Sequence, residues 1–315
     1  MSAVKKVWQK GAVKVWLVGD RGMLGTSMRA QLETAGVPFL GSDQELDITD
    51  REQALAFAKQ EGFTHILNCA AYTNVDGAET EEELATRVNG GGAGNLAASA
   101  AACGAKLLHV STDYVFEGNA EQPYREDAPT GPIGAYGRSK LAGEQAIWQE
   151  LPIQAPSADA PSASVVRTSW LFGPRGKNFV TTMLRLMAER PLLRVVADQR
   201  GKPTYCPDLA HACVEVAGLT GKRCEPGLYH FANSGECSWH DFACEILRLA
   251  KAAGLPIRTE RVEAIATSEY PTPAKRPPYS VLDTSRITAV LGREPRPWPV
   301  ALAEYINEIA NQSTP

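Results

Sequence analysis

The chain has 315 residues, and its 32 lysine and arginine residues against 36 aspartate and glutamate residues give a net charge of −4. Nucleic-acid binders usually carry a basic excess, so this balance argues against that class. No apolar run approaches the roughly 18 residues that span a bilayer. We therefore expect a cytoplasmic protein of enzyme size, with neither nucleic acid nor membrane as a partner.

The seven cysteines are odd in number and include no Cys-x-x-Cys pair. This pattern indicates reduced thiols rather than a disulfide framework or a zinc site. Lys5, Lys6 and Lys10 precede an apolar stretch that stops at Gly19 and is too short for a secretion signal. We interpret the start of the chain as a tail leading into the first strand.

Short apolar runs alternate with helical patterns through the first half of the chain. We predict strands at 13–18, 37–41, 64–68, 106–110 and 164–168. Helices are expected between them at 23–34, 54–60, 79–102 and 134–150. This alternation predicts an α/β fold, with a Rossmann-type doubly wound parallel sheet.

The second half is less regular and holds most of the prolines. We expect residues 1–165 to form the dinucleotide-binding domain and residues 166–315 to form mainly a smaller substrate-binding lobe. A segment at about 194–225 is expected to return to the main sheet. The stretch 151–164 is rich in Pro, Ala and Ser and is expected to be a loop.

A glycine-rich turn follows the first predicted strand and opens the first predicted helix. Gly19, Gly22 and Gly25 form a G-x-x-G-x-x-G pattern. Glycines there permit a tight turn and close approach to a pyrophosphate, and the helix N-terminus supplies N–H donors. The spacing resembles the extended branch of the short-chain dehydrogenase/reductase superfamily.

The choice of dinucleotide depends on two residues of opposite charge. Asp43, at the end of the second strand, would accept a hydrogen bond from a ribose 2′-hydroxyl and favour NAD. Arg21 inside the loop would pair with a 2′-phosphate and favour NADP. We expect NADPH, with NADH as the alternative. Asp47 and Ile48 are expected near the adenosine, although Asp47 is also a candidate helix cap.

A second glycine run, Gly90–Gly94, lies inside a helical pattern and has no strand directly before it. We interpret it as a set of small residues that lets the helix pack closely on the sheet, not as another phosphate loop.

Tyr136 and Lys140 form a Y-x-x-x-K pair whose spacing puts both on one helix face. An ammonium one turn away would lower the pKa of the phenol, which is near 10 in isolation. Thr112 lies at the end of a predicted strand, where ligands of parallel sheets bind, and its hydroxyl can orient a carbonyl and the phenol. These three residues are the predicted catalytic set.

Nearly the whole chain resembles the dTDP-4-dehydrorhamnose reductase family. The resemblance rests on the following segments: GDRGMLG at 19–25, NCAAYTNVDGAE at 68–79, VN at 88–89, STDYVFEG at 111–118, YGRSK at 136–140, VVRTSWLFG at 165–173, KNFVTTMLRL at 177–186, ADQRGKPT at 197–204 and KRPPYSVLDTSR at 275–286. It implies hydride transfer from NAD(P)H to the C4 ketone of dTDP-4-dehydro-L-rhamnose, with Tyr136 as the proton donor.

The resemblance also assigns roles to individual residues. The cofactor contacts it implies are those of Gly22, Met23, Leu24, Asp47, Ile48, Ala70, Ala71 and Tyr72. The expected cofactor set is completed by Gly19, Arg21, Gly25, Asp43, Asn89, Tyr136 and Lys140. Substrate contacts are implied for Val75, Thr112, Asp113, Tyr114 and Trp170. Ser27 stands where some members carry a glutamate that bridges a dimer through magnesium, so no metal is predicted and both a monomer and a homodimer stay open.

Two alternatives remain at this point. An epimerase-reductase resembling GDP-fucose synthase needs a further Cys–His acid–base pair, and this chain has Ser111-Thr112-Asp113-Tyr114 where that family's cysteine falls. A non-catalytic NADP-binding subunit resembling methionine adenosyltransferase beta would share the fold without the reaction.

Overall fold

The computed structural model describes residues 13–151, 160–221 and 224–313. The expected N-terminal tail and most of the expected 151–164 loop lie outside these residues. Within them, none of the helices is both long and apolar enough to cross a bilayer.

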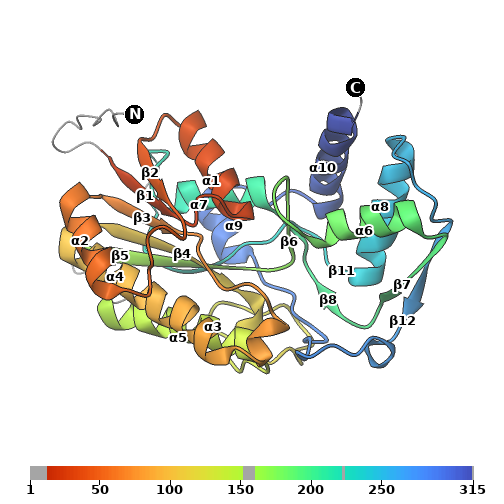
Figure 1. The fold of residues 1–315 in the computed structure, drawn as a ribbon, viewed down its shortest axis with the longest axis horizontal. Coiled ribbons are helices and arrows are strands. Elements are labelled where there is room, and N and C mark those ends of the chain that lie inside the picture. Colours follow the sequence, from red (N-terminus) through yellow and green to blue (C-terminus); the bar gives the residue numbers. More distant parts are fainter. Residues whose placement is uncertain (1–12, 152–159, 222–223, 314–315) are drawn as a thin grey trace.

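A six-stranded parallel sheet forms the larger part of the molecule (Figure 1). Its strands are β1 (Val15–Val18), β2 (Phe39–Ser42), β3 (His65–Asn68), β4 (Lys106–Thr112), β5 (Ser162–Thr168) and β10 (Gly227–His230). They lie in the order β10-β5-β4-β3-β1-β2, and every neighbouring pair is parallel. The strand order reverses between β1 and β3, which is where open α/β sheets bind ligands. The predicted fold class is confirmed.

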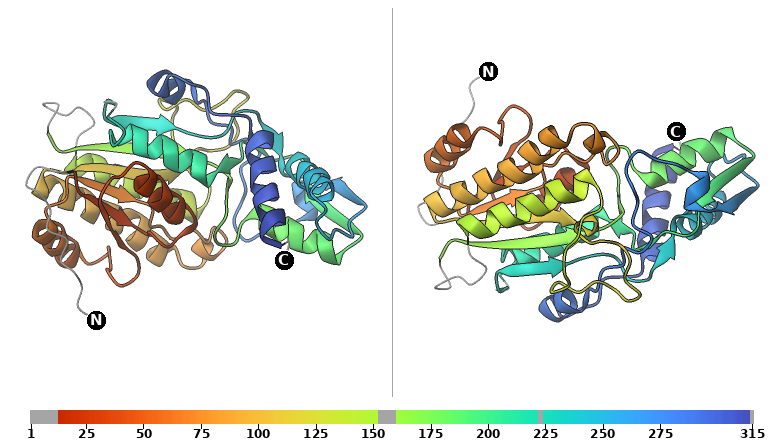
Figure 2. Two further views of the ribbon diagram at one scale, coloured as in Figure 1. Left: turned by 90° about the horizontal axis from the view of Figure 1, so that it is seen from above. Right: turned by 90° about the horizontal axis from the view of Figure 1, so that it is seen from below.

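Helices cover both faces of this sheet (Figures 1 and 2). One face carries α1 (Met23–Thr34), α7 (Cys206–Val216) and α9 (Ser285–Leu291), and the other carries α2 (Arg51–Glu61), α4 (Ala93–Cys103) and α5 (Ala135–Glu150). Side chains alternate along β1, so Val15 and Leu17 enter the first core while Trp16 and Val18 enter the second. This two-sided burial explains why the strands consist of continuous apolar runs.

The predicted helix at 79–102 is not continuous. The structure has η1 (Gly77–Glu79), α3 (Glu82–Thr86) and a π-helical turn, η2 (Arg87–Gly92), before α4 begins. A Cβ on Gly92 would lie 2.7 Å from Ile48 Cδ1, and one on Gly94 would lie 3.0 Å from Ala146 Cβ. The glycine run therefore permits close packing against α5 and Ile48, not against the sheet as expected.

A smaller lobe lies beyond the carboxyl ends of the sheet strands (Figure 1). It contains α6 (Phe179–Glu189), α8 (Trp239–Ala252) and α10 (Trp298–Ser313), which share a third hydrophobic core. Short strand pairs complete it: β7 (Leu192–Val196) with β12 (Arg261–Ile265), β8 (Arg200–Gly201) with β11 (Cys237–Ser238), and β6 (Leu171–Phe172) with β9 (Thr204–Tyr205).

The chain enters this lobe and returns to the sheet more than once. The segment at about 194–225 contains most of β7, which lies in the smaller lobe. It also contains α7, which packs against α1 of the main sheet's cover. β10 then joins the edge of the main sheet beside β5. The division of the chain at residue 165 stays a prediction.

Candidate active site

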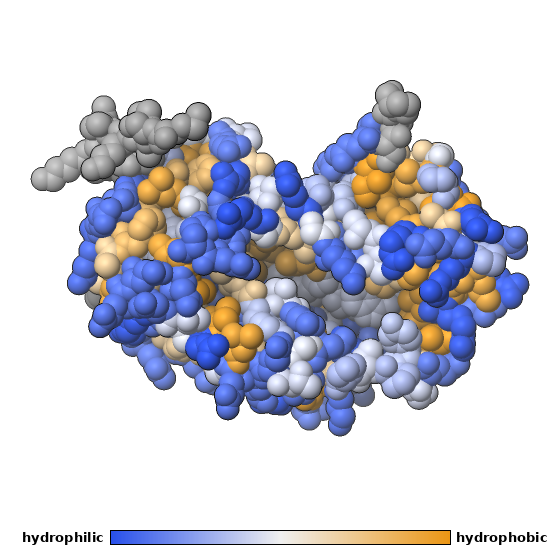
Figure 3. All heavy atoms as spheres, in the orientation of Figure 1, coloured by the Kyte–Doolittle hydropathy of each residue, from blue (hydrophilic) through white to orange (hydrophobic). Residues whose placement is uncertain are grey.

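A cleft of about 890 Å³ crosses the carboxyl ends of the sheet strands. Figure 3 shows the face hollowed between the sheet and the smaller lobe. The predicted site residues that line the cleft are Gly19, Gly22, Met23, Leu24, Asp43, Asp47, Ile48, Ala70, Ala71, Tyr72, Val75, Thr112, Asp113, Tyr114, Tyr136, Lys140 and Trp170. Arg21, Gly25 and Asn89 lie next to the cleft without lining it.

The glycine loop forms one end of this cleft. Gly19 has φ of +73°, a left-handed conformation, and a Cβ on Gly25 would lie 1.9 Å from the Gly19 carbonyl oxygen. Gly22 is the N-cap of α1 and provides no side-chain cap, and the first turn holds no acidic residue. The first N–H groups of α1 are thus open to an anion, which is the geometry expected for a pyrophosphate.

Arg21 and Asp43, the two residues expected to influence the choice of dinucleotide, are in contact with each other. The Arg21 backbone N–H donates to Asp43 Oδ2 at 3.3 Å, and its guanidinium pairs with Asp43 and Glu45. The positive charge expected to attract a 2′-phosphate is therefore already paired with carboxylates. Asp47 accepts from the Thr49 N–H at 2.8 Å, and the N-cap of α2 is Asp50 instead.

Asn89 holds the backbone segment that follows β3, and this segment lines the cleft. Its side chain accepts from the Tyr72 N–H at 2.8 Å and donates to the Tyr72 carbonyl at 3.0 Å. It also donates to Ser139 Oγ at 2.9 Å on α5. Asn89 therefore fixes the position of the segment that contains Ala70 and Ala71 and lines the cleft.

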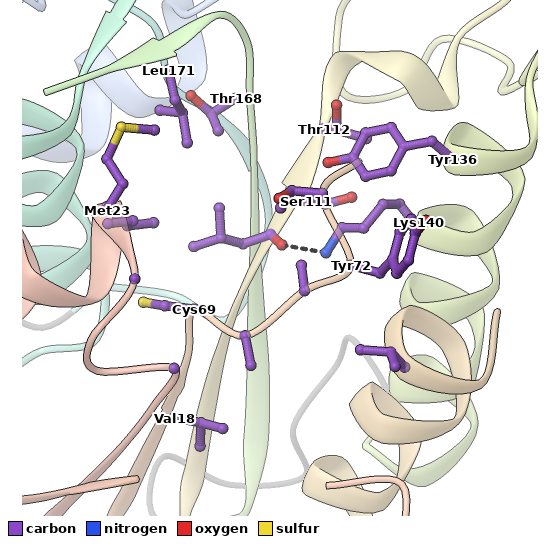
Figure 4. A pocket seen from close by; sticks show the side chains of 18 of the residues that line it. Val18, Met23, Cys69, Tyr72, Ser111, Thr112, Tyr136, Lys140, Thr168 and Leu171 are labelled. Carbon is purple, nitrogen blue, oxygen red and sulfur yellow. Dashed lines mark hydrogen bonds between the residues drawn. The ribbon is translucent and has the colours of Figure 1, made fainter. Parts of the chain in front are cut away.

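Thr112, Tyr136 and Lys140 meet where β4 ends against the start of α5 (Figure 4). Desolvation of the Tyr136 hydroxyl and the charge of Asp113 raise the pKa of Tyr136 to about 12, opposed by a hydrogen bond with Thr112. The expected lowering by Lys140 is not present. Lys140 Nζ instead donates to the Val110 carbonyl at 2.8 Å and lies 3.1 Å from His109 Nε2.

Two buried titratable groups, Lys140 of this set and the neighbouring Asp113, have shifted pKa values. Burial lowers the pKa of Lys140 to about 8, although Glu144 and Cys69 oppose the shift. Burial raises the pKa of Asp113 to about 6, opposed by hydrogen bonds from Ser280 and Thr112. The cleft therefore places a lysine and a carboxyl group that each change charge near neutral pH beside a phenol that stays protonated.

Trp170 lies on the side of the cleft nearest the smaller lobe. Its φ of +48° is in the left-handed region, which is strained for a bulky residue. Its ring stacks on Trp239 of α8 with centroids 3.6 Å apart, and a Cβ on Gly201 would lie 2.5 Å from Trp170 Cε2. These neighbours hold the indole in place at the cleft wall.

The sequence analysis missed several cleft residues. Among them are Cys69, Ser111, Thr168, Ser169 and Lys177. All of these five except Lys177 lie at or just beyond the carboxyl ends of β3, β4 and β5. Because ligands of parallel sheets bind at the carboxyl ends of the strands, this position could have identified them from the sequence. Lys275 and Arg276 open the 275–286 segment of the resemblance, but neither lines the cleft, and Arg276 pairs with Asp76 at 2.9 Å.

Comparisons with known proteins identify the family of the chain. Residues 13–311 match the family model described as the RmlD substrate binding domain. A dTDP-4-dehydrorhamnose reductase of Streptomyces griseus is 43% identical over 295 residues, covering 92% of each chain. A dTDP-4-keto-6-deoxy-D-glucose reductase of Streptomyces niveus is 40% identical over 269 residues, covering 85% of this chain and 88% of the relative.

A solved structure of similar fold contains a dinucleotide. The dTDP-4-dehydrorhamnose reductase of Bacillus anthracis, in complex with NADP, has a TM-score of 0.84 and 35% identity, covering 94% of this chain and 99% of the other. The resemblance predicted from the sequence motifs is confirmed by these matches. The chain belongs to the family described by the RmlD substrate binding domain, together with these reductases.

Proposed function

We propose that this protein reduces the C4 ketone of dTDP-4-dehydro-L-rhamnose to dTDP-L-rhamnose with NADPH. The observation that carries the proposal is the meeting of Thr112, Tyr136 and Lys140 in a cleft that begins at the glycine loop. The Streptomyces griseus relative is named dTDP-4-dehydrorhamnose reductase, after this reaction. The protein is expected to act in the cytoplasm, as a monomer or homodimer.

The loop residues fit a dinucleotide. A Cβ on Gly25 would collide with the Gly19 backbone, so glycine permits this tight turn, and the uncapped start of α1 leaves N–H groups for a pyrophosphate. When bound, NADPH would supply the hydride. The Bacillus anthracis relative was solved with NADP, which supports NADPH over NADH although Asp43 and Glu45 surround Arg21.

The chain's own groups supply the proton and the orientation. Because its pKa is about 12, the Tyr136 phenol is protonated at neutral pH and can donate to the alkoxide that develops on the ketone oxygen. Thr112 holds that hydroxyl by a hydrogen bond. A positive Lys140, turned toward the phenol, would stabilise the phenolate left behind.

The test is Tyr136→Phe, with Tyr270→Phe at an exposed tyrosine as the matched control. We expect the first variant to lose keto-sugar-dependent NADPH oxidation by a factor of about 10² or more, because the proton donor is gone. The control should keep the wild-type rate. The assignment is wrong if Tyr136→Phe retains that rate with its fold and NADPH affinity intact.

A second substrate is favoured by one finding, the match to the Streptomyces niveus reductase of dTDP-4-keto-6-deoxy-D-glucose. A panel of 4-keto-6-deoxy sugar nucleotides, assayed with NADPH and NADH at the nicotinamide absorbance, ranks the two substrates by kcat/KM. The same panel tests the non-catalytic alternative, because a binding subunit would oxidise NADPH with none of them.

A further inference from the structure

His109 on β4 lies directly behind the proposed catalytic lysine. Its Nε2 is 3.1 Å from Lys140 Nζ, and its Nδ1 is 2.9 Å from the Asn68 side-chain nitrogen. Asn68 and His109 are 1% exposed and Lys140 is 2% exposed. Polar atoms buried to this degree need partners of the correct type, so the positions of the hydrogens can be deduced.

A backbone contact orients the Asn68 amide. The Ala70 N–H donates to Asn68 Oδ1 at 3.0 Å, so the oxygen is an acceptor and Nδ2 faces His109. Because Nδ2 can only donate, His109 Nδ1 must accept, and a neutral ring then carries its proton on Nε2. A charged ring is disfavoured, since burial and Lys140 hold the pKa of His109 well below its ordinary value.

The proton on Nε2 decides which form of Lys140 fits. An ammonium would set two donors 3.1 Å apart. A neutral amine accepts from Nε2–H through its lone pair and still donates to the Val110 carbonyl at 2.8 Å. The contacts of Lys140 are thus all satisfied only when it is uncharged.

The titratable groups whose charges oppose the lowered pKa of Lys140 are Glu144 and Cys69, and they do not reverse this conclusion. Glu144, one turn along α5, is paired with Arg167 of β5 at 2.7 Å. The Cys69 thiol after β3 has a pKa raised to about 12 by burial and is neutral, as is Tyr136. None of these groups provides an unpaired negative charge that would hold an ammonium here.

We propose that Asn68 and His109 are positioning residues, which together favour the neutral amine of Lys140 against β4 in the dinucleotide-free protein and so make this lysine easier to deprotonate. Above the pH at which the free lysine loses its charge, Lys140 must take up a proton from solvent as it turns into the cleft to meet the dinucleotide. Dinucleotide affinity should accordingly fall as pH rises above about 8, where the free lysine loses its charge. This inference rests on the proposed function only for the later role of Lys140.

The first experiment measures protonation in the dinucleotide-free protein and involves no enzyme activity. Nitrogen-15 NMR of the histidine rings reports the His109 tautomer, and the carbon-13 shift of Lys140 Cε is followed from pH 6 to 11. Wild type should show the proton on Nε2 and a lysine midpoint near 8. A proton on Nδ1, or a midpoint near the ordinary 10.5, overturns the proposal.

Two substitutions change the hydrogen-bond pattern while keeping the size of the side chain similar. In Asn68→Asp the carboxylate accepts from Nδ1–H, so Nε2 becomes an acceptor for an ammonium. In His109→Gln the amide oxygen can face Lys140 directly. Both should raise the Lys140 midpoint by about one pH unit or more, whereas the exposed control His211→Gln should leave it unchanged.

Calorimetry measures the pH above which NADP⁺ affinity falls. In both variants this pH should rise together with the Lys140 midpoint. Unchanged midpoints in folded Asn68→Asp and His109→Gln would show that the two residues only fill space. If the midpoints move as expected but the wild-type protein reduces no keto sugar, the proposed function fails and this inference stands.

Discussion

The ion pair between Arg167 of β5 and Glu144 of α5 gives the sharpest stability prediction. Arg167 Nε and Nη2 donate to the two Glu144 oxygens at 2.9 and 2.7 Å, and the two side chains are only 4% and 3% exposed. Arg167 also lies over the Phe116 ring at 4.9 Å. Replacing Arg167 by Met leaves a buried carboxylate without its partner, which costs about 3–5 kcal/mol.

Urea unfolding followed by circular dichroism and by tryptophan fluorescence measures this loss. The double variant Arg167→Met with Glu144→Leu removes both charges and should recover most of the stability, because an apolar pair of similar volume needs no compensation. The control Arg185→Met breaks an exposed pair with Glu189 and should cost less than about 0.5 kcal/mol. A single variant as stable as this control, or a double variant no better than the single one, would refute the reasoning.

Three further predictions concern the cleft and the smaller lobe. Gly25→Ala sets a Cβ against the Gly19 carbonyl and displaces the glycine turn, so NADPH binding measured by nicotinamide fluorescence should be lost; an unchanged Kd would show that binding does not need this turn. Gly201→Ala displaces the Trp170 indole and should lower kcat/KM for the sugar nucleotide by on the order of 10- to 100-fold, with NADPH affinity retained. Asn178→Ala removes the capping box of α6 and should cost about 1 kcal/mol, seen as a lower Tm; no change in Tm would show that the cap is dispensable.

Five of the six strands of the main sheet, all except β10, could be predicted because their signals are local. The strands are apolar runs separated by helical patterns, and predicted and observed bounds differ by a few residues, as at β1 and β2. The glycine loop follows from three residues and their neighbours. Sequence order alone also indicates where parallel strands end, which is why most of the expected site residues line one cleft.

The features that sequence reasoning missed depend on contacts between distant segments. The π-helical turn η2 forms where Gly92 packs on Ile48 and the Asn89 side chain reaches Tyr72 and Ser139. The state of Lys140 depends on His109, 31 residues away in sequence. Spacing indicated that a lysine would lie one turn from a tyrosine, but it could not show that the lysine is turned toward β4.

The position of β10 restricts how the molecule can be divided. This strand completes the sheet beside β5, yet it is reached only after the chain has built part of the smaller lobe. A fragment ending at residue 165 would expose the backbone edge of β5, with a row of unpaired N–H and C=O groups that favours aggregation. The larger part therefore needs the second half of the chain to close its own sheet, and neither half is a suitable unit for truncation or domain exchange.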